Sequence, residues 1–116
     1  TPGTADNKNG ILLYANNLRF KNVPMRKEMQ KYINVPILIE NDANCAALAE
    51  SIAGAASDAE NSIMITLGTG IGGGIIIDKK LYSGFNGAAA EVGHMSIMVD
   101  GKLCTCGRSG PPRCGW

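Results

Sequence analysis

The alternation of apolar and polar positions in the first half of the chain predicts short strands and a helix. Residues 1–10 are polar and rich in Asn, Asp and Gly, which is typical of a loop, and Ile11–Tyr14 follow as a candidate strand. Pro24 suits the first turn of a helix, and apolar residues recur after it at helical spacing as far as Asn34. The β-branched run 35–39 then predicts a short buried strand.

A second helix is predicted directly after this strand. Residues 43–56 consist mainly of Ala, Leu and Glu, which favour helix, and either Asn41 or Asp42 is a natural N-cap. A carboxylate at this strand-to-helix junction would lie at the positive end of the helix dipole. Two interpretations therefore stay open: the carboxylate serves only to cap the helix, or it is placed there for function.

The second half of the chain predicts β-structure around a glycine loop. Most of the 15 glycines lie between positions 68 and 115, and this shift in composition divides the chain in two. Residues 102–116 contain too many Gly, Pro and Cys for a regular element. The predicted elements are strands at Ser62–Leu67, Ile75–Ile77 and Met95–Val99, a glycine loop over Gly68–Gly74 and a hairpin turn at Asp100-Gly101.

Composition restricts the functional classes. The 116 residues carry a net charge of +1, without the basic excess that binding to a nucleic-acid backbone requires. No run of about 18 apolar residues predicts a transmembrane helix, and no signal-peptide pattern is present. We therefore expect a cytoplasmic domain that binds neither nucleic acid nor membrane, and Thr1 in place of an initiating Met suggests a piece of a longer chain.

The glycine loop is the first candidate for chemistry. Gly68, Gly70 and Gly73 match the dinucleotide pattern G-x-G-x-x-G, but that mechanism needs a helix to start in the loop, and here a strand-forming run follows. A strand–loop–strand hairpin with Thr66 and Thr69 could instead bring backbone N–H groups close to phosphate oxygens. A tight glycine hairpin without a ligand is the alternative.

The segment 40–44, Glu-Asn-Asp-Ala-Asn, is the second candidate. An ionised Asp only accepts hydrogen bonds while Asn both donates and accepts, so the segment could grip vicinal hydroxyls. An Asp near the reference pKa of about 3.9 is ionised at pH 7, so the Asp at position 42 could take a proton from an alcohol. A plain helix cap is again the alternative.

The third candidate is a set of nitrogen and sulfur donors. His94, Cys104, Cys106 and Cys114 form a borderline-soft group that suits tetrahedral zinc, and the C-x-C spacing disfavours a disulfide. Free thiols in a small domain are the alternative. Cys45 lies in the Ala-rich helix and is expected to be a small buried residue rather than a ligand.

Taken in order, four motifs resemble the ROK family, which contains bacterial glucokinases, other sugar kinases and sugar-responsive repressors. The resemblance covers roughly residues 1–110 and implies an α/β fold of the actin-like, ribonuclease-H-like ATPase type, in which ATP and sugar meet between two lobes. The chain would be a partial copy, with the sugar-binding end of the first lobe in 1–60 and the start of the second lobe in 61–116. The motifs are Glu40-Asn-Asp-Ala-Asn44, Leu67-Gly-Thr-Gly-Ile-Gly-Gly-Gly74, Asn86-Gly-x-x-x-Glu91-x-Gly-His94 and Cys104-x-Cys106-Gly107.

The resemblance implies a role for each motif. Asp42 would be the catalytic base, which deprotonates a sugar hydroxyl for attack on the γ-phosphate of ATP with Mg²⁺. A structural zinc ion would order the loop that carries the sugar-binding side chains. The implied positions are Gly3, Asn41, Glu91 and His94 for sugar; Gly68, Thr69, Gly70, Gly72 and Gly73 for phosphate; and His94, Cys104, Cys106 and Cys114 for zinc.

Three departures from the family pattern qualify this implication. Pro111 stands where the family has its third zinc cysteine, so Cys114 would have to substitute. Ala90 stands where the family normally has Gly. The family's N-terminal phosphate loop is absent from the sequence.

The expected function is therefore ATP-dependent phosphorylation of a hexose by a glucokinase-like enzyme, homodimeric at full length, with little or no activity in this segment alone. The alternative is the sugar-sensing domain of a ROK-type repressor, and the intact Asn41-Asp42 pair favours the kinase. A small zinc-ribbon module is a third possibility that leaves the glycine loop unexplained.

Overall fold

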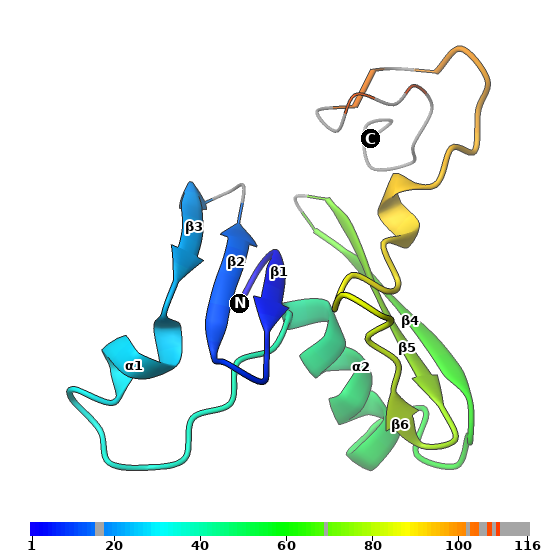
Figure 1. The fold of residues 1–116 in the computed structure, drawn as a ribbon. Helices are drawn as coiled ribbons and strands as arrows, with labels where there is room; N and C mark the ends of the chain where they lie inside the picture. Colours follow the sequence, from blue (N-terminus) through cyan, green and yellow to red (C-terminus); the bar gives the residue numbers. More distant parts are fainter. Residues whose placement is uncertain (16–17, 69, 102, 105–106, 108, 110–116) are drawn as a thin grey trace.

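The computed structural model describes residues 1–15, 18–68, 70–101, 103, 104, 107 and 109. Figure 1 shows two small sheets side by side, with the longer helix between them, packed on the second sheet. Each sheet has three antiparallel strands, in the orders β1-β2-β3 and β4-β5-β6. The elements are β1 (Thr4–Asp6), β2 (Ile11–Ala15), β3 (Phe20–Val23), α1 (Met25–Met29), α2 (Asp42–Ala53), β4 (Ser62–Leu67), β5 (Ile71–Ile77), β6 (Lys80–Leu81) and the 3₁₀ helix η2 (Val92–His94).

The first sheet contains one predicted strand and two that the sequence pattern did not predict. β2 corresponds to the strand expected at 11–14. β1 lies inside the segment predicted as a loop, because the small residue Ala5 is buried against Ile37 and Ile39 although its neighbours are polar. β3 pairs with β2 through Leu12↔Val23, and Leu12 is completely buried.

The helix predicted to run to Asn34 is much shorter. α1 ends at Met29, and local backbone hydrogen bonds continue only as far as the N–H of Ile33. No residue of α1 is buried, and Tyr32, on the predicted apolar face, is 85% exposed. Only Met25 of α1 packs on the buried cluster of Ala5, Ile37 and Ile39. A short helix with so little tertiary packing is marginal, which explains why the apolar periodicity alone does not extend it.

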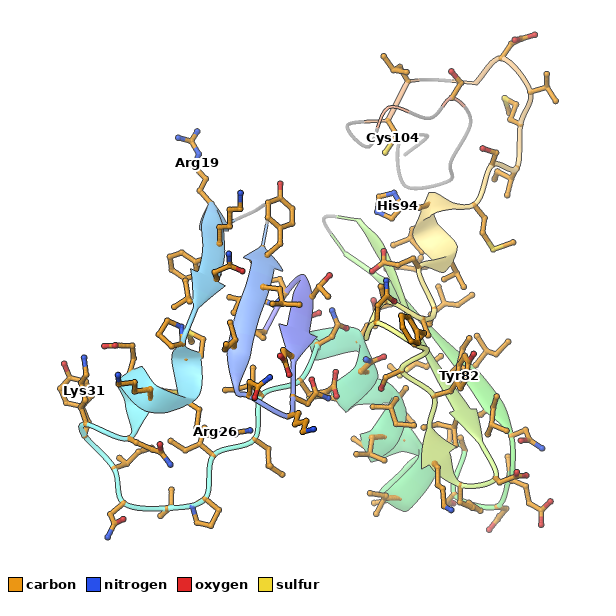
Figure 2. All side chains as sticks on the ribbon, in the orientation of Figure 1. Arg19, Arg26, Lys31, Tyr82, His94 and Cys104 are labelled. Carbon is orange, nitrogen blue, oxygen red and sulfur yellow. The ribbon has the colours of Figure 1, made fainter. Side chains whose placement is uncertain are left out.

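The prediction of a β-strand at 35–39 is wrong. The segment does bury Ile37 and Ile39, but it pairs with no other strand within the described part of the chain. The Nε of Arg26 donates to the carbonyl of Ile37 over 2.9 Å, so a side chain takes the acceptor that a neighbouring strand would use. Figure 2 shows Arg26 projecting toward the segment that leads into α2.

The second half follows the prediction more closely. α2 starts and ends within three residues of the predicted helix, and β4 coincides with the predicted strand. β5 is longer than predicted, since it begins at Ile71 opposite Leu67 and includes Gly72–Gly74. The strand predicted at Met95–Val99 is wrong: these residues adopt bends, turns and irregular backbone.

Three consecutive glycines in β5 allow unusually close packing. A Cβ on Gly72 would lie 3.2 Å from Ala43 Cβ, and one on Gly74 would lie 2.4 Å from Ala47 Cβ. On the other face, a Cβ on Gly73 would lie 2.5 Å from the carbonyl oxygen of Ala90. Helix α2 and the segment before η2 therefore both rest directly on the backbone of β5.

The described helices include none that is long and apolar enough to cross a bilayer.

Candidate active site

One cleft, of about 640 Å³, brings most of the predicted site residues together. Its walls are the N-terminal segment 2–4, the start of α2, the β4–β5 hairpin and the segment 87–94. The predicted residues that line it are Gly3, Asn41, Asp42, Gly68, Gly70, Gly72, Gly73, Glu91 and His94. Thr69 lies outside the described residues. The cleft thus joins the positions expected for base, sugar and phosphate.

Asn41 is the N-cap of α2. Its Oδ1 accepts hydrogen bonds from the N–H groups of Ala43 (2.9 Å) and Asn44 (3.1 Å), two donors that the helix itself cannot satisfy. Its Nδ2 donates to the carbonyl of Gly3 over 3.0 Å. The capping interpretation is therefore confirmed for Asn41, and the cap also ties the helix to the N-terminal wall of the cleft.

Asp42 is the first residue of α2 and not its cap. Its N–H donates to the carbonyl of Thr1 (3.0 Å), and its Oδ1 accepts from the N–H of Ala43 (3.0 Å). The residue is exposed and lines the cleft. Among the residues that the structure describes, Oδ2 of Asp42 has no hydrogen-bond donor, so this oxygen can accept a proton from a ligand.

Gly3 occupies a conformation that excludes other residues. Its φ is +83°, and a Cβ there would lie 2.0 Å from the carbonyl oxygen of Tyr14. Glycine at this position lets the N-terminal segment approach the end of β2 and receive the Asn41 side chain.

The glycine loop is a tight hairpin that runs from one strand directly into the next. β4 ends at Leu67 and β5 begins at Ile71, and the N–H of Gly68 donates to the carbonyl of Gly70 over 3.0 Å. Because no helix begins here, the dinucleotide interpretation fails as expected. A Cβ on Gly68 would have no neighbour within 4 Å, so this end of the loop is open. Gly72 and Gly73, in contrast, have a packing reason to be glycine.

Glu91 and His94 lie at either end of the η2 turn. The N–H of His94 donates to the carbonyl of Glu91 over 3.0 Å, and His94 Nε2 lies 3.6 Å from Glu91 Oε2. The Glu91 side chain is 57% exposed and that of His94 22% exposed. Ala90, just before them, has a φ of +62°, which explains why the family pattern has glycine there.

The predicted zinc set is only partly described. Cys104 is buried and His94 half-buried, while Cys106 and Cys114 lie outside the described residues. The described residues contain no group of three or more His, Cys, Asp or Glu that could hold a metal ion. Figure 2 shows His94 on η2 and Cys104 in the chain beyond it. Cys45 is exposed, so the expectation that it is buried is wrong: it points away from the side of α2 that packs on β5.

Three further polar residues line the cleft, of which the sequence pattern indicated Thr66 only as part of the phosphate hairpin and indicated no role of its own for Tyr14 or Asn44. Thr66 lies on β4 beside Gly72, Tyr14 lies at the end of β2, and Asn44 lies one turn into α2. Asn44 is 2% exposed. The sequence signal that could have marked Asn44 is an amide within an Ala-rich helix. Such an amide needs hydrogen-bond partners once it is buried.

Comparison with known proteins places the chain in a family. The profile of the ROK family matches residues 1–114. The chain belongs to the ROK family. The glucokinase of Halalkalibacterium halodurans is 37% identical to this ROK chain over 110 residues, which are 94% of the chain and 33% of that protein. The xylose repressor of Caldicellulosiruptor bescii is 41% identical over 109 residues, which are 94% of the chain and 27% of that protein.

Solved ROK structures agree on the fold. A ROK family glucokinase from Streptomyces griseus, in complex with glucose and AMPPNP, superposes with a TM-score of 0.83 and is 43% identical, over 94% of this chain and 35% of that one. The predicted α/β, actin-like ATPase fold is thus confirmed, as a partial copy. The chain spans about a third of the length of the kinases it matches, and its relatives include both kinases and repressors.

Proposed function

We propose that this ROK chain is the central part of an ATP-dependent hexose kinase, and that its cleft holds the sugar with the transferred phosphate. One observation carries the proposal: the Asp42 carboxylate, the β4–β5 hairpin and the Glu91–His94 turn line a single cleft. A similar kinase carries glucose and AMPPNP in its crystal structure.

In this mechanism Asp42 is the general base. It takes the proton of a sugar hydroxyl, whose oxygen attacks the γ-phosphorus of ATP, and ADP leaves. Its position at the start of α2 orients the carboxylate, and the helix dipole favours negative charge there. Phosphoryl transfer depends mainly on positioning and charge stabilisation, so a fixed base and a shaped cleft account for most of the protein's part.

The remaining walls of the cleft would hold the two substrates. Glu91 accepts hydrogen bonds from sugar hydroxyls, and the His94 imidazole can donate or accept. Asn41 and Gly3 would contribute to the same sugar site. The phosphates of ATP would lie against Gly68, Thr69 and Gly70, with the glycines at 72 and 73 allowing close approach.

Magnesium would enter with ATP. This ion prefers oxygen ligands and is usually held by substrate phosphates together with one or two carboxylates. Asp42 and Glu91 are the carboxylates that line the cleft, so the donor chemistry fits.

Zinc is a separate, structural proposal. His94 and Cys104, with Cys106 and Cys114, offer the nitrogen and sulfur donors that zinc prefers. Bound there, zinc would restrain the segment that carries His94. Removal of zinc from the full-length protein by a chelator is expected to weaken sugar binding, and metal analysis that finds no zinc would contradict the proposal.

Three broader expectations belong to the same proposal. The full-length protein would be a homodimer in the cytoplasm, where ATP is supplied. Residues 1–60 and 61–116 would contribute to different lobes. Helix α2 belongs to the first of these parts but packs on the sheet of the second.

The test uses the full-length protein that contains this segment. Release of ADP in the presence of a hexose measures phosphorylation, and calorimetry measures sugar binding. We expect Asp42→Asn to lower kcat by roughly 10²–10⁴-fold, the usual contribution of a general base, while sugar binding persists. Asp78→Asn, in the β5–β6 turn and away from the cleft, is the matched control. A D42N variant with wild-type kcat would refute the role of Asp42.

A sugar-sensing repressor is the second candidate, favoured by the 41% identity to a xylose repressor. It predicts sugar binding with no sugar-dependent ADP release. The same two assays therefore separate the alternatives.

A further inference from the structure

We infer that Glu40 is a positioning residue, which together with Asn44 holds Asp42 in place for catalysis. This inference rests on the proposed function, since it gives Asp42 the role of the base. Glu40 directly precedes the N-cap of α2, does not line the cleft, and is only half-buried.

Both oxygens of the Glu40 carboxylate accept hydrogen bonds. Oε1 accepts from the backbone N–H of Asn41 (2.8 Å) and from the side-chain amide of Asn44 (2.9 Å). Oε2 accepts from the side-chain amide of Asn7. Hydrogen bonds to an ionised acceptor are roughly twice as strong as neutral ones, so a carboxylate suits this position better than an amide.

The bond between Glu40 and Asn44 spans Asp42. Asn44 is 2% exposed, and an amide buried that deeply is costly without partners. The Glu40 carboxylate supplies one partner to its side chain, and Asn41 Oδ1 accepts from its backbone N–H. The residues on both sides of Asp42 are thus fixed by the same small network.

Glu40 also joins the two halves of the molecule. Asn7 lies in the turn between β1 and β2, while Asn44 belongs to α2, which packs on the second sheet. A single side chain therefore links the first sheet to the helix that carries the base. Asn41 Oδ1 accepts from the N–H groups of Ala43 and Asn44, and the carbonyl of Thr1 accepts from that of Asp42, so the first turn of α2 is capped without the Glu40 side chain.

The test is Glu40→Ala in the full-length protein, with Glu50→Ala as the matched control. Glu50 is the equivalent carboxylate at the other end of α2: its Oε2 accepts from the N–H of Ala55 over 2.8 Å, and it does not line the cleft. We expect E40A to lower kcat by about 10–100-fold, as small displacements of a reacting group do, and to leave KM for ATP unchanged. E50A should leave kcat near wild type even where it lowers the melting temperature equally. Glu40→Gln, which retains the Oε1 acceptor, should recover most of the lost kcat.

A double variant distinguishes positioning from general stabilisation. If Glu40 acts through Asp42, adding E40A to D42N should lower the residual kcat no further, because the base is already absent. Additive losses, or a kcat for E40A no lower than that for E50A, would overturn the inference. If D42N itself retains wild-type kcat, or the protein phosphorylates no sugar, the proposed function fails first, which is a different result from a failure of Glu40 alone.

Discussion

Replacement of Gly74 by Ala tests whether close packing on β5 positions α2. The added Cβ would lie 2.4 Å from Ala47 Cβ and 2.9 Å from the carbonyl oxygen of Ala43. Carbon atoms pack at about 3.5–4.0 Å, so the helix must move away by about 1 Å or more. Overpacking of this kind costs about 1–3 kcal/mol, offset by the roughly 0.5–1 kcal/mol that Ala gains over Gly within a strand.

We therefore expect G74A to lower the free energy of unfolding by about 1–2 kcal/mol, measured by urea denaturation of the full-length protein. Gly68→Ala is the control, because its Cβ would meet nothing within 4 Å. The same displacement would shift Asp42, so kcat should fall in G74A as well. Equal free energies of unfolding for G74A and G68A would refute the reasoning that α2 packs directly on the backbone of β5.

Three other outcomes follow from single residues. Ala90→Gly should raise the free energy of unfolding by about 1 kcal/mol in the same denaturation experiment, since φ is +62° there; no gain would contradict a strained Ala90. Asn41→Ala should lower it by about 1–2 kcal/mol through loss of the cap, and an unchanged value would count against that role. The backbone and side-chain hydrogen bonds from Asn9 hold the pKa of Asp6 below its ordinary 3.8. The ionised Asp6 therefore stabilises the fold above pH 3.8, and this stabilisation is lost as the pH falls through the lowered pKa. Asn9→Ala should raise the pKa of Asp6 in an NMR titration, and a pKa that does not move would refute the cause.

The sequence predicts an element correctly where its local signals agree with the tertiary structure. α2 combines strong helix formers with an Asn cap, and β4 is a β-branched run that ends at a glycine turn, so both were predictable. The gathering of Asp42, the hairpin and His94 in one cleft followed from the family resemblance and not from spacing alone.

The failures have a common physical cause, which is contact with distant residues. β1 is polar, and it forms because Ala5 fits against Ile37 and Ile39, more than 30 positions away. The segment 35–39 is extended and apolar but is held by the Arg26 side chain instead of a strand. The role inferred for Glu40 was hidden for the same reason, since its carboxylate reaches Asn7 in the first turn of the chain.

The glycines of β5 have one more consequence. Helix α2, which carries Asp42, packs on one face of this strand, and the segment that leads to Glu91 and His94 packs on the other. The separation between the wall with Asp42 and the wall with His94 is therefore set by the backbone of β5, which carries no side chains at positions 72–74. A side chain added on this part of β5 would displace one wall or the other, so the width of the cleft depends on glycine at positions 72–74.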